Sequence, residues 1–250
     1  MLAPAALTIP RRLIPTLMLA HHDENAIGGD RSLVFADLER HGVLAEGGGL
    51  TAEAHAVVGV MVDPTLVVSV EVASPLGRQR STLWGTEDLA VWGRPAAGDA
   101  FELRRVDPVE IPLLLTQLTG VGHRPPPPFT GGVTVETAAL TTAIDWRGDD
   151  PDGALGVLVS SGVEPVWADR LLIAHDHLRT EWTVSSVAGP TNGEPHVVEL
   201  HVVDAGPAGY WRIDDDELCT TYTVVSHHGV VAELLRAVPD IAGHAPIERI

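Results

Sequence analysis

Residues 175–181, with the sequence HDHLRTE, place two histidines and a glutamate close together. Imidazole nitrogens and carboxylate oxygens are common ligands of transition metals. Side chains two residues apart on a β-strand point to the same side, so His175 and His177 could share one metal ion if this segment were a strand. The preceding residues predict instead that a helix ends here, and residues two apart on a helix diverge. The metal hypothesis therefore depends on the secondary structure of this segment.

The same spacing, H-x-H with a glutamate beyond it, is similar to the metal motif of cupin barrels. Asp169 and Ala188 stand where that motif has glycine, and no second cupin motif is found. A metal-dependent, cupin-like enzyme that uses His175, His177 and Glu181 is accordingly the alternative interpretation. The simpler interpretation is a polar helix end, where histidines suit the negative end of the helix dipole.

A second pair of histidines, His227 and His228, follows Ser226 in the sequence SHHGVVAELLRAVPD. Serine is a favoured N-cap residue, and an apolar stripe follows it at helical spacing. No carboxylate lies at metal-binding spacing from these histidines unless Glu233 folds back. The pattern predicts a closing helix, with the two histidines at the corner between the last strand and that helix.

Other signatures of catalysis or cofactor binding are missing. The sequence GDDPDG resembles a calcium loop, but Gly148 and Val159 stand where the site needs carboxylates, and a helix cap at Asp150 explains it better. The chain has no G-x-S-x-G, H-E-x-x-H, C-x-x-C, Walker or dinucleotide-binding motif. Cys219, the only cysteine, falls in an expected strand, where a buried, inert thiol is expected. We therefore predict no catalytic, cofactor-binding or metal-binding residue.

Composition limits the partners that the chain could bind. Its 34 acidic residues outnumber 16 basic ones, all of them arginine, which gives a formal net charge of −18. Such a surface repels phosphate backbones and anionic lipid headgroups, so we expect neither nucleic acid nor a membrane as partner. One cysteine allows no internal disulfide, and no stretch reaches the ~18 apolar residues of a spanning helix. These features predict a cytoplasmic protein, and a hydrophobic fraction of 45% is enough for a sizeable core.

The first half of the chain has a clear order of expected elements. A helix at residues 32–41 ends at Gly42, and a second helix starts after Thr51, a favoured N-cap type. Four β-rich runs separated by turn clusters follow over residues 65–107, which predicts an antiparallel meander. A third helix then ends at Gly120.

After a proline-rich connector at residues 121–132, the order helix, helix, four strands, helix occurs again. The halves span about 30–120 and 136–240. Each meander has one apolar face that needs cover, so two similar meanders can join their sheets around a pseudo-twofold axis. The predicted fold class is α+β: a quasi-twofold antiparallel β-sheet built from two helix-helix-meander-helix halves, with helices packed around it. We expect one domain over residues 1–250.

Tryptophans are the first candidates for contact with a partner. Trp92, Trp182 and Trp211 fall in or beside expected strands, and Trp92 and Trp211 stand at similar places in the two halves. Most tryptophans in such positions belong to the core, but tryptophan is also enriched in binding hot spots. Together with Leu234 and Leu235 of the closing helix, they form the predicted partner-binding set.

The arrangement resembles the EspG family of ESX (type VII) secretion-associated chaperones over nearly the whole chain. The segments that carry the resemblance are LTIPRRLIPTL, LVFADLERHGVL, STLWGTEDLAVWGR, EIPLLLTQLTG, LHVVDAGPAGYWRI and YTVVSHHGVVAELLRAVP. Two features depart from the family pattern. Pro15 is expected to interrupt the N-terminal helix, and no arginine directly follows Gly209 in the turn between two late strands.

The resemblance implies a cytosolic, non-enzymatic chaperone that binds secreted helical ESX substrates, such as PE–PPE-like heterodimers, and escorts them to the secretion machinery. It also implies that the central sheet and the C-terminal helical bundle contact the client, and that no cofactor is needed. The sequence alone leaves open the oligomeric state, the identity of the client, and an α+β module with another binding function.

Overall fold

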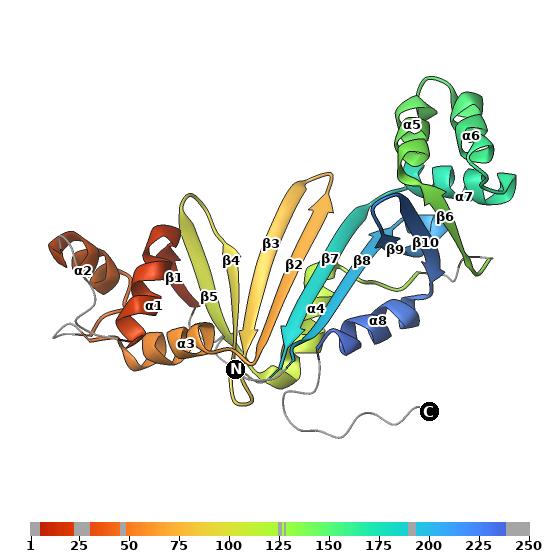
Figure 1. The fold of residues 1–250 in the computed structure, drawn as a ribbon. Coiled ribbons are helices and arrows are strands. Elements are labelled where there is room, and N and C mark those ends of the chain that lie inside the picture. The colour runs from red at the N-terminus through yellow and green to blue at the C-terminus, as the bar shows by residue number, and fades with distance from the viewer. Residues whose placement is uncertain are drawn as a thin grey trace.

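One antiparallel β-sheet runs through the protein, as the computed structural model shows (Figure 1). The structure describes residues 6–22, 31–45, 49–124, 127, 129–189 and 194–238. Within them the sheet has ten strands in the order β1-β5-β4-β3-β2-β7-β8-β9-β10-β6. Helices pack on both faces, which confirms the α+β class predicted from the sequence. None of the helices in these residues is both long enough and apolar enough to cross a bilayer.

Each half of the chain, in its described residues, contains an edge strand, three helices, a four-stranded meander and a closing helix. The N-terminal half consists of β1 (Ala6–Pro10), a 3₁₀ turn (Arg11–Leu13), α1 (Ile14–His22), α2 (Arg31–Arg40), α3 (Ala52–Val62), β2 (Leu66–Ser74), β3 (Gly77–Gly85), β4 (Ala90–Pro95), β5 (Ala100–Val106), a 3₁₀ turn (Pro108–Glu110) and α4 (Ile111–Thr119). The C-terminal half consists of β6 (Gly132–Glu136), α5 (Thr137–Arg147), α6 (Pro151–Ser160), α7 (Pro165–Asp176), β7 (Thr180–Ala188), β8 (His196–Asp204), a 3₁₀ turn (Gly206–Ala208), β9 (Tyr210–Asp215), β10 (Cys219–Val225) and α8 (His227–Arg236).

The two halves join at the middle of the sheet, where β2 pairs with β7. This antiparallel pairing runs from Leu66 opposite Ala188 to Ala73 opposite Glu181. On either side of the join the strand order of one half repeats that of the other, and β1 and β6 form the outer edges. The quasi-twofold sheet predicted from the repeated pattern is therefore confirmed.

Strands β1 and β6 and helix α5 are not among the elements expected from the sequence. The two strands are short and lie at the sheet edges, and β6 begins at Gly132, the last residue of the expected proline-rich connector. The expectation that Pro15 interrupts the N-terminal helix was wrong. Pro15 is the second residue of α1, and in the first turn of a helix the missing N–H has no intrahelical partner to lose.

Local side chains decide where several helices begin. Thr51, Asp150 and Ser226 each accept a hydrogen bond from the backbone amide three residues further on, at 3.3, 2.9 and 3.1 Å. Each bond pairs an N–H that the first turn of a helix leaves without a partner. All three residues were predicted as helix caps from the sequence, and the structure confirms them.

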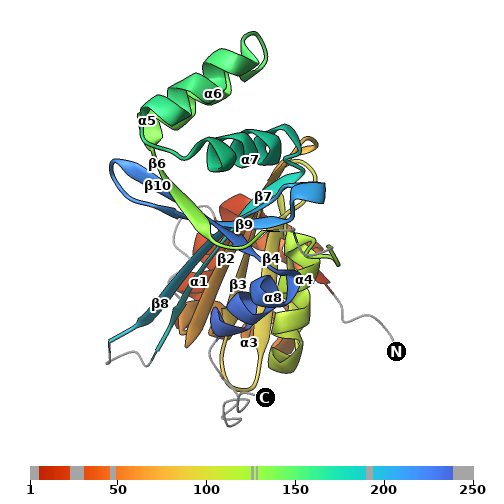
Figure 2. The ribbon, with the colours of Figure 1, turned by 90° about the vertical axis from the view of Figure 1, so that its right-hand side faces the viewer.

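Helices α4 and α8 cover the middle of one face of the sheet, side by side in Figure 2. The apolar cluster between them and the strands, here called the central core, draws on both halves of the chain. Its largest members include Leu66, Leu83, Trp92, Ile111, Leu115, Trp182, Tyr210 and Leu234. Since neither half completes this cluster alone, its burial stabilises the join between the halves as well as each meander.

The opposite face carries a helical bundle at each end of the sheet (Figure 1). The N-terminal bundle, α1 to α3, packs on β1, β5 and β4 around Ile9, Leu17 and Phe101. The C-terminal bundle, α5 to α7, packs on β6, β10 and β9 around Leu158 and Trp211. Between the bundles no described helix covers this face over β2, β7 and the parts of β3 and β8 beyond Trp84 and Val203, which the bundles reach. This stretch is here called the open face.

Trp92 and Trp211 do not occupy equivalent positions, contrary to the expectation from the sequence. Trp92 belongs to the central core, whereas Trp211 faces the C-terminal bundle on the opposite side of the sheet. The residue of β9 that faces the central core is Tyr210, one position earlier. Because side chains alternate along a strand, an alignment error of one residue assigns a side chain to the wrong face.

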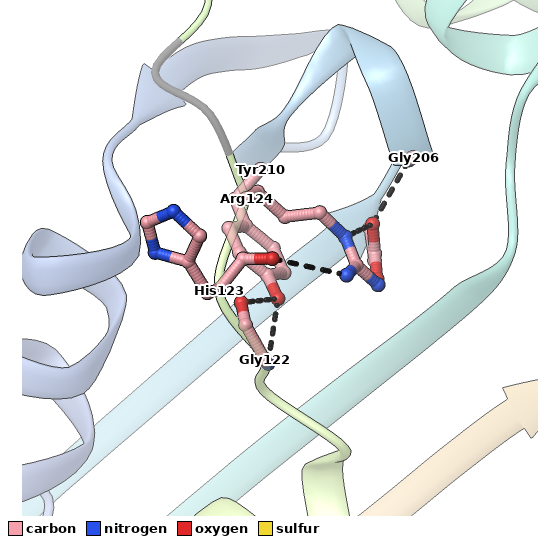
Figure 3. A network of polar contacts seen from close by, with 6 residues as sticks. Gly122, His123, Arg124, Gly206 and Tyr210 are labelled. Atoms are coloured by element: carbon pink, nitrogen blue, oxygen red, sulfur yellow. Dashed lines mark hydrogen bonds and ion pairs between the residues drawn. The ribbon is translucent and has the colours of Figure 1, made fainter.

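The connector between the halves is tied to the C-terminal half by the polar network of Figure 3. The Tyr210 hydroxyl donates to the carbonyl of Gly122 at 2.9 Å and accepts from the amide of Gly122 at 3.0 Å. Arg124 donates through Nε and Nη2 to the Asp204 carboxylate at 3.2 and 2.6 Å. The same carboxylate accepts from the Gly206 amide at 2.9 Å. These bonds hold the connector beside β8 and β9.

We expect Arg124→Ala to lower the free energy of unfolding. The Asp204 side chain is only 6% exposed, and removing its cation leaves a nearly buried carboxylate poorly paired. Breaking a fully buried pair costs roughly 3–5 kcal/mol, so this partly exposed pair should cost about 2 kcal/mol. Chemical denaturation measures the loss. As a control, Arg236→Ala removes the exposed pair with Glu233 and should cost less than about 0.5 kcal/mol. Equal losses in the two variants would contradict this account.

Candidate partner-binding site

Four of the five residues predicted to bind a partner lie in the interior. Trp182, Trp211 and Leu234 are 1% exposed and Trp92 is 6% exposed. Side chains buried to this degree stabilise the fold and present almost no surface to a second protein. Leu235, on α8, is 43% exposed, so it alone of the set has surface to offer. A role for Leu235 in partner binding stays a prediction.

His175, His177 and Glu181 do not form a metal centre. His175 lies in the last turn of α7, His177 caps the end of that helix, and Glu181 lies in β7. Glu181 bonds to His201 rather than to the other two. Among the residues that the structure describes, no group of three or more His, Cys, Asp or Glu side chains could hold a metal ion. The cupin-like alternative has no support in this open sheet.

His227 and His228 open α8 at the corner after β10, as predicted. The ring of His227 makes an edge contact with His123 of the connector, with 6.0 Å between centroids, and another with His228 at 5.5 Å. The pair therefore packs where the connector passes the start of α8. This face carries the central core and lies opposite the open face.

The open face offers a mixed polar and apolar surface. Ser69 on β2 lies opposite Ser185 on β7, and both side chains point away from the central core. Val187 on β7 lies opposite Val197 on β8, and these two are 45% and 63% exposed. Exposed apolar side chains that gather on one face can mark a surface for contact with another protein.

A pocket of about 210 Å³ lies at the side of the open face, between the C-terminal bundle and strands β7 to β10. Most of its lining is apolar: Leu140, Ile144, Leu171, Leu172, Ala174, Leu178, Val203, Trp211 and Ile213. Its polar lining consists of His175, Glu181 and Tyr222. Apolar walls with a few converging polar groups are the usual form of a binding site.

Behind the polar side of the pocket, His201 bonds to the lining residue Glu181. Its Nε2 lies 2.8 Å from Oε1 of Glu181, and its Nδ1 lies 3.6 Å from Oδ2 of Asp215. The hydrogen bond from His201 lowers the pKa of Glu181 below its ordinary value, although burial opposes this shift. Burial alone would lower the pKa of His201, but the two carboxylates outweigh it and raise that pKa. At neutral pH Glu181 is therefore ionised.

Tyr222 supplies a neutral hydroxyl to the same side of the pocket. Burial raises the pKa of Tyr222 to about 12, and the charges of Asp215 and Glu181 add to the shift. The phenol thus stays protonated at physiological pH and can both donate and accept a hydrogen bond.

Sequence reasoning singled out Glu181 for a metal site and passed over His201, Asp215 and Tyr222. These residues lie on four different strands, and no local spacing connects them. They meet because His201 pairs with Ile213 on β9, and Ile213 pairs with Tyr222 on β10. Only the register of the whole meander brings them together, so a strand-by-strand reading could not find the cluster.

Comparisons with known proteins bear on the fold. No protein-family model matches the sequence, and no curated protein matches it. The molecule belongs to the α+β proteins with one quasi-twofold antiparallel sheet, a helical bundle at each end of one face and two helices on the other. A solved structure of this kind is the Mycobacterium tuberculosis type VII secretion system chaperone EspG5, determined in complex with a PE25-PPE41 dimer.

The likeness to EspG5 has a TM-score of 0.62 with 15% sequence identity, and it covers 95% of this chain and 96% of that chain. This chain therefore has an EspG-like fold. The family resemblance drawn from the sequence segments is confirmed at the level of the fold.

We expect the stability that His201 contributes to depend on pH. A pKa raised in the folded state stabilises the protein below the unfolded value, near 6.5, and this contribution is lost as pH rises through the folded pKa. The loss of melting temperature in His201→Gln should therefore be largest near pH ~6 and should shrink by pH ~8.5, since the imidazole is then neutral in both states. The charged groups that face His201 are Glu181 on β7 and Asp215 on β9.

The Glu181 carboxylate stays ionised over this interval, because its pKa is lowered and its contribution is lost only as pH falls below about 4.5. His196→Gln, at the exposed start of β8, is the matched control and should show no such trend. Thermal unfolding of the three proteins at several pH values makes the comparison. A loss in His201→Gln that stays constant with pH would contradict the prediction.

Proposed function

We propose that this protein is a non-enzymatic chaperone that binds secreted helical substrates of a type VII (ESX) secretion system. Its clients are PE–PPE-like heterodimers or similar helical pairs, and it escorts them in the cytoplasm to the secretion machinery. The observation that carries the proposal is the likeness to EspG5, a type VII secretion system chaperone solved with a PE25-PPE41 dimer, over nearly the full length of both chains.

The described surface supports this role. The open face and the pocket beside the C-terminal bundle adjoin each other, and they lie where the family resemblance puts client contact. Leu178 at the pocket is 40% exposed, and Val187 and Val197 on the open face are more so. The end of a helical client could lie on the open face and place one side chain in the pocket.

The first test is complex formation. The full chain is co-expressed with each small helical secreted pair encoded nearby in its genome, and the products are separated by gel filtration. We expect a stable complex with one copy of each protein for at least one pair. If every such pair elutes separately from the chain, the chaperone role is contradicted.

The second test locates the contact surface. Leu178→Asp places a charge at the pocket, and Ser185→Arg places a large cation on the open face. Each change should weaken client binding at least about tenfold, which corresponds to about 1.4 kcal/mol. Leu113→Asp is the control, because Leu113 is 59% exposed on α4, on the opposite side of the sheet. Equal weakening by all three would mean that the client does not use this face.

A further inference from the structure

The pocket beside the C-terminal bundle combines an apolar interior with an acidic rim. Its walls are mostly leucine, isoleucine, valine and tryptophan side chains, and Glu181 lines its polar side. Asp215 lies just beyond the lining, 3.6 Å from the imidazole of His201 that bonds to Glu181. The side chains of Glu181 and Asp215 are 43% and 55% exposed, so both can meet a group that arrives from solvent. A volume of about 210 Å³ is below the ~300–1,000 Å³ typical of sites for drug-sized ligands. One amino-acid side chain is therefore a better match in size.

The two rim carboxylates lack a guanidinium of their own. Most other acidic residues that form ion pairs in the described structure are bonded to arginine, as Asp176 is to Arg147 and Asp204 is to Arg124. Glu181 and Asp215 share the single imidazole of His201. Arg78 on β3, whose charge also acts on Glu181, donates its hydrogen bond to Glu71 on β2 at 2.9 Å. The other basic groups near Glu181 are His175 on the pocket wall and, further off, Arg78, and neither forms an ion pair with Glu181 or Asp215. The two carboxylates therefore keep oxygens that no guanidinium occupies.

The Tyr222 hydroxyl is a further polar group at the pocket, and it is available for a hydrogen bond to a ligand. It makes no hydrogen bond to any other residue in the described part of the chain, although it lines the pocket. The Tyr222 side chain is half-buried and its oxygen is still reached by solvent, so an incoming donor can take the place of water there. An anion is disfavoured at the same position by the carboxylates.

We infer that the pocket binds one long basic side chain, an arginine or lysine, presented by the client protein. Its methylene stem lies against the apolar walls, where Leu140, Ile144 and Leu178 provide contact. Its cationic head meets Glu181 and Asp215, and the Tyr222 oxygen accepts one of its hydrogen bonds. This inference rests on the proposed chaperone function for the source of the side chain, and it adds the charge by which a client is selected.

The physical basis is that long basic side chains are amphipathic. They bury an apolar stem and keep the charged head where it can be solvated or paired, which matches an apolar pocket with an acidic rim. A purely apolar side chain would cover the carboxylates without compensating them, and partly desolvated charges left unpaired weaken binding. An acidic side chain would add repulsion. The rim therefore discriminates between clients by charge, with the walls contributing contact area.

A test without any client uses small probes. The full chain, labelled with ¹⁵N at tryptophan indoles, is titrated with n-butylguanidinium and with n-butylurea, which has nearly the same shape but no charge. We expect n-butylguanidinium to shift the indole resonance of Trp211, which lines the pocket, and n-butylurea to shift it at least fivefold less at equal concentration. Glu181→Gln should remove most of the difference. Equal shifts from the two probes would overturn the inference.

A second test uses the client pair identified by co-expression. Asp215→Asn should weaken client binding about fivefold or more and reduce its dependence on salt. Asp214→Asn is the matched control: it is the same change one residue earlier, at 53% exposure, on the face that carries the central core. Replacing the responsible basic residue of the client by norleucine, which keeps the stem, should reproduce the loss. A charge-reversal pair, Asp215→Arg with a glutamate on the client, should restore binding.

The outcomes separate the two proposals. If a client binds with unchanged affinity to both Asp215→Asn and Glu181→Gln, the basic-side-chain site is overturned and the chaperone role stands. If no client binds but n-butylguanidinium is held in a Glu181-dependent manner, the site is supported for a free guanidinium or amine and the chaperone role fails. Melting temperatures of the variants show whether each is folded, and Asp215, being half exposed, should tolerate asparagine.

Discussion

The pairing of β2 with β7 is the constraint on which the rest of the structure depends. It joins two similar meanders into one sheet through backbone hydrogen bonds from Leu66 opposite Ala188 to Ala73 opposite Glu181. Because the pairing is antiparallel and in register, the faces of the two meanders coincide. Side chains such as Val68 and Val184 then form one central core beneath α4 and α8. The helical bundles are placed on the other face, at opposite ends of the sheet, and the open face is what the two bundles leave uncovered.

The two ends of that face have diverged within one architecture. In the N-terminal half, the positions beside the bundle are filled by large apolar side chains, among them Trp84 and Phe101, which meet closely above Gly93 and leave no room for a Cβ there. In the C-terminal half, the corresponding region carries Glu181, His201 and Asp215 around a pocket. The repeated fold thus provides two similar regions, one beside each bundle. The region beside the C-terminal bundle can hold polar residues while the core beneath the N-terminal bundle stays intact.

The sequence predicted what is local and missed what depends on register. Helix starts at Thr51, Asp150 and Ser226 could be found because a cap acts within four residues of itself. The edge strand β6 could not, since only its pairing with β10 makes it a strand, and prolines dominate the residues before it. Aligning Trp92 with Trp211 is wrong by one residue, and this error predicts both side chains on the same face of the sheet although they lie on opposite faces. The rim cluster needed the alignment of four strands, for which no short motif exists.

A likeness at 15% identity shows a shared fold and leaves open which partner each chain selects. Between proteins of one fold, the charge of half-exposed side chains can differ at little cost to stability. Exposed carboxylates contribute little to folding, whereas at an interface they repel like charges and attract opposite ones. In a chain with a net charge of −18 and no lysine, the general field already favours basic partners at long range. Glu181 and Asp215 place negative charge at one position, where it attracts a cation at short range. The apolar walls beside them contact the methylene stem, so the inferred site fits a long basic side chain better than other side chains.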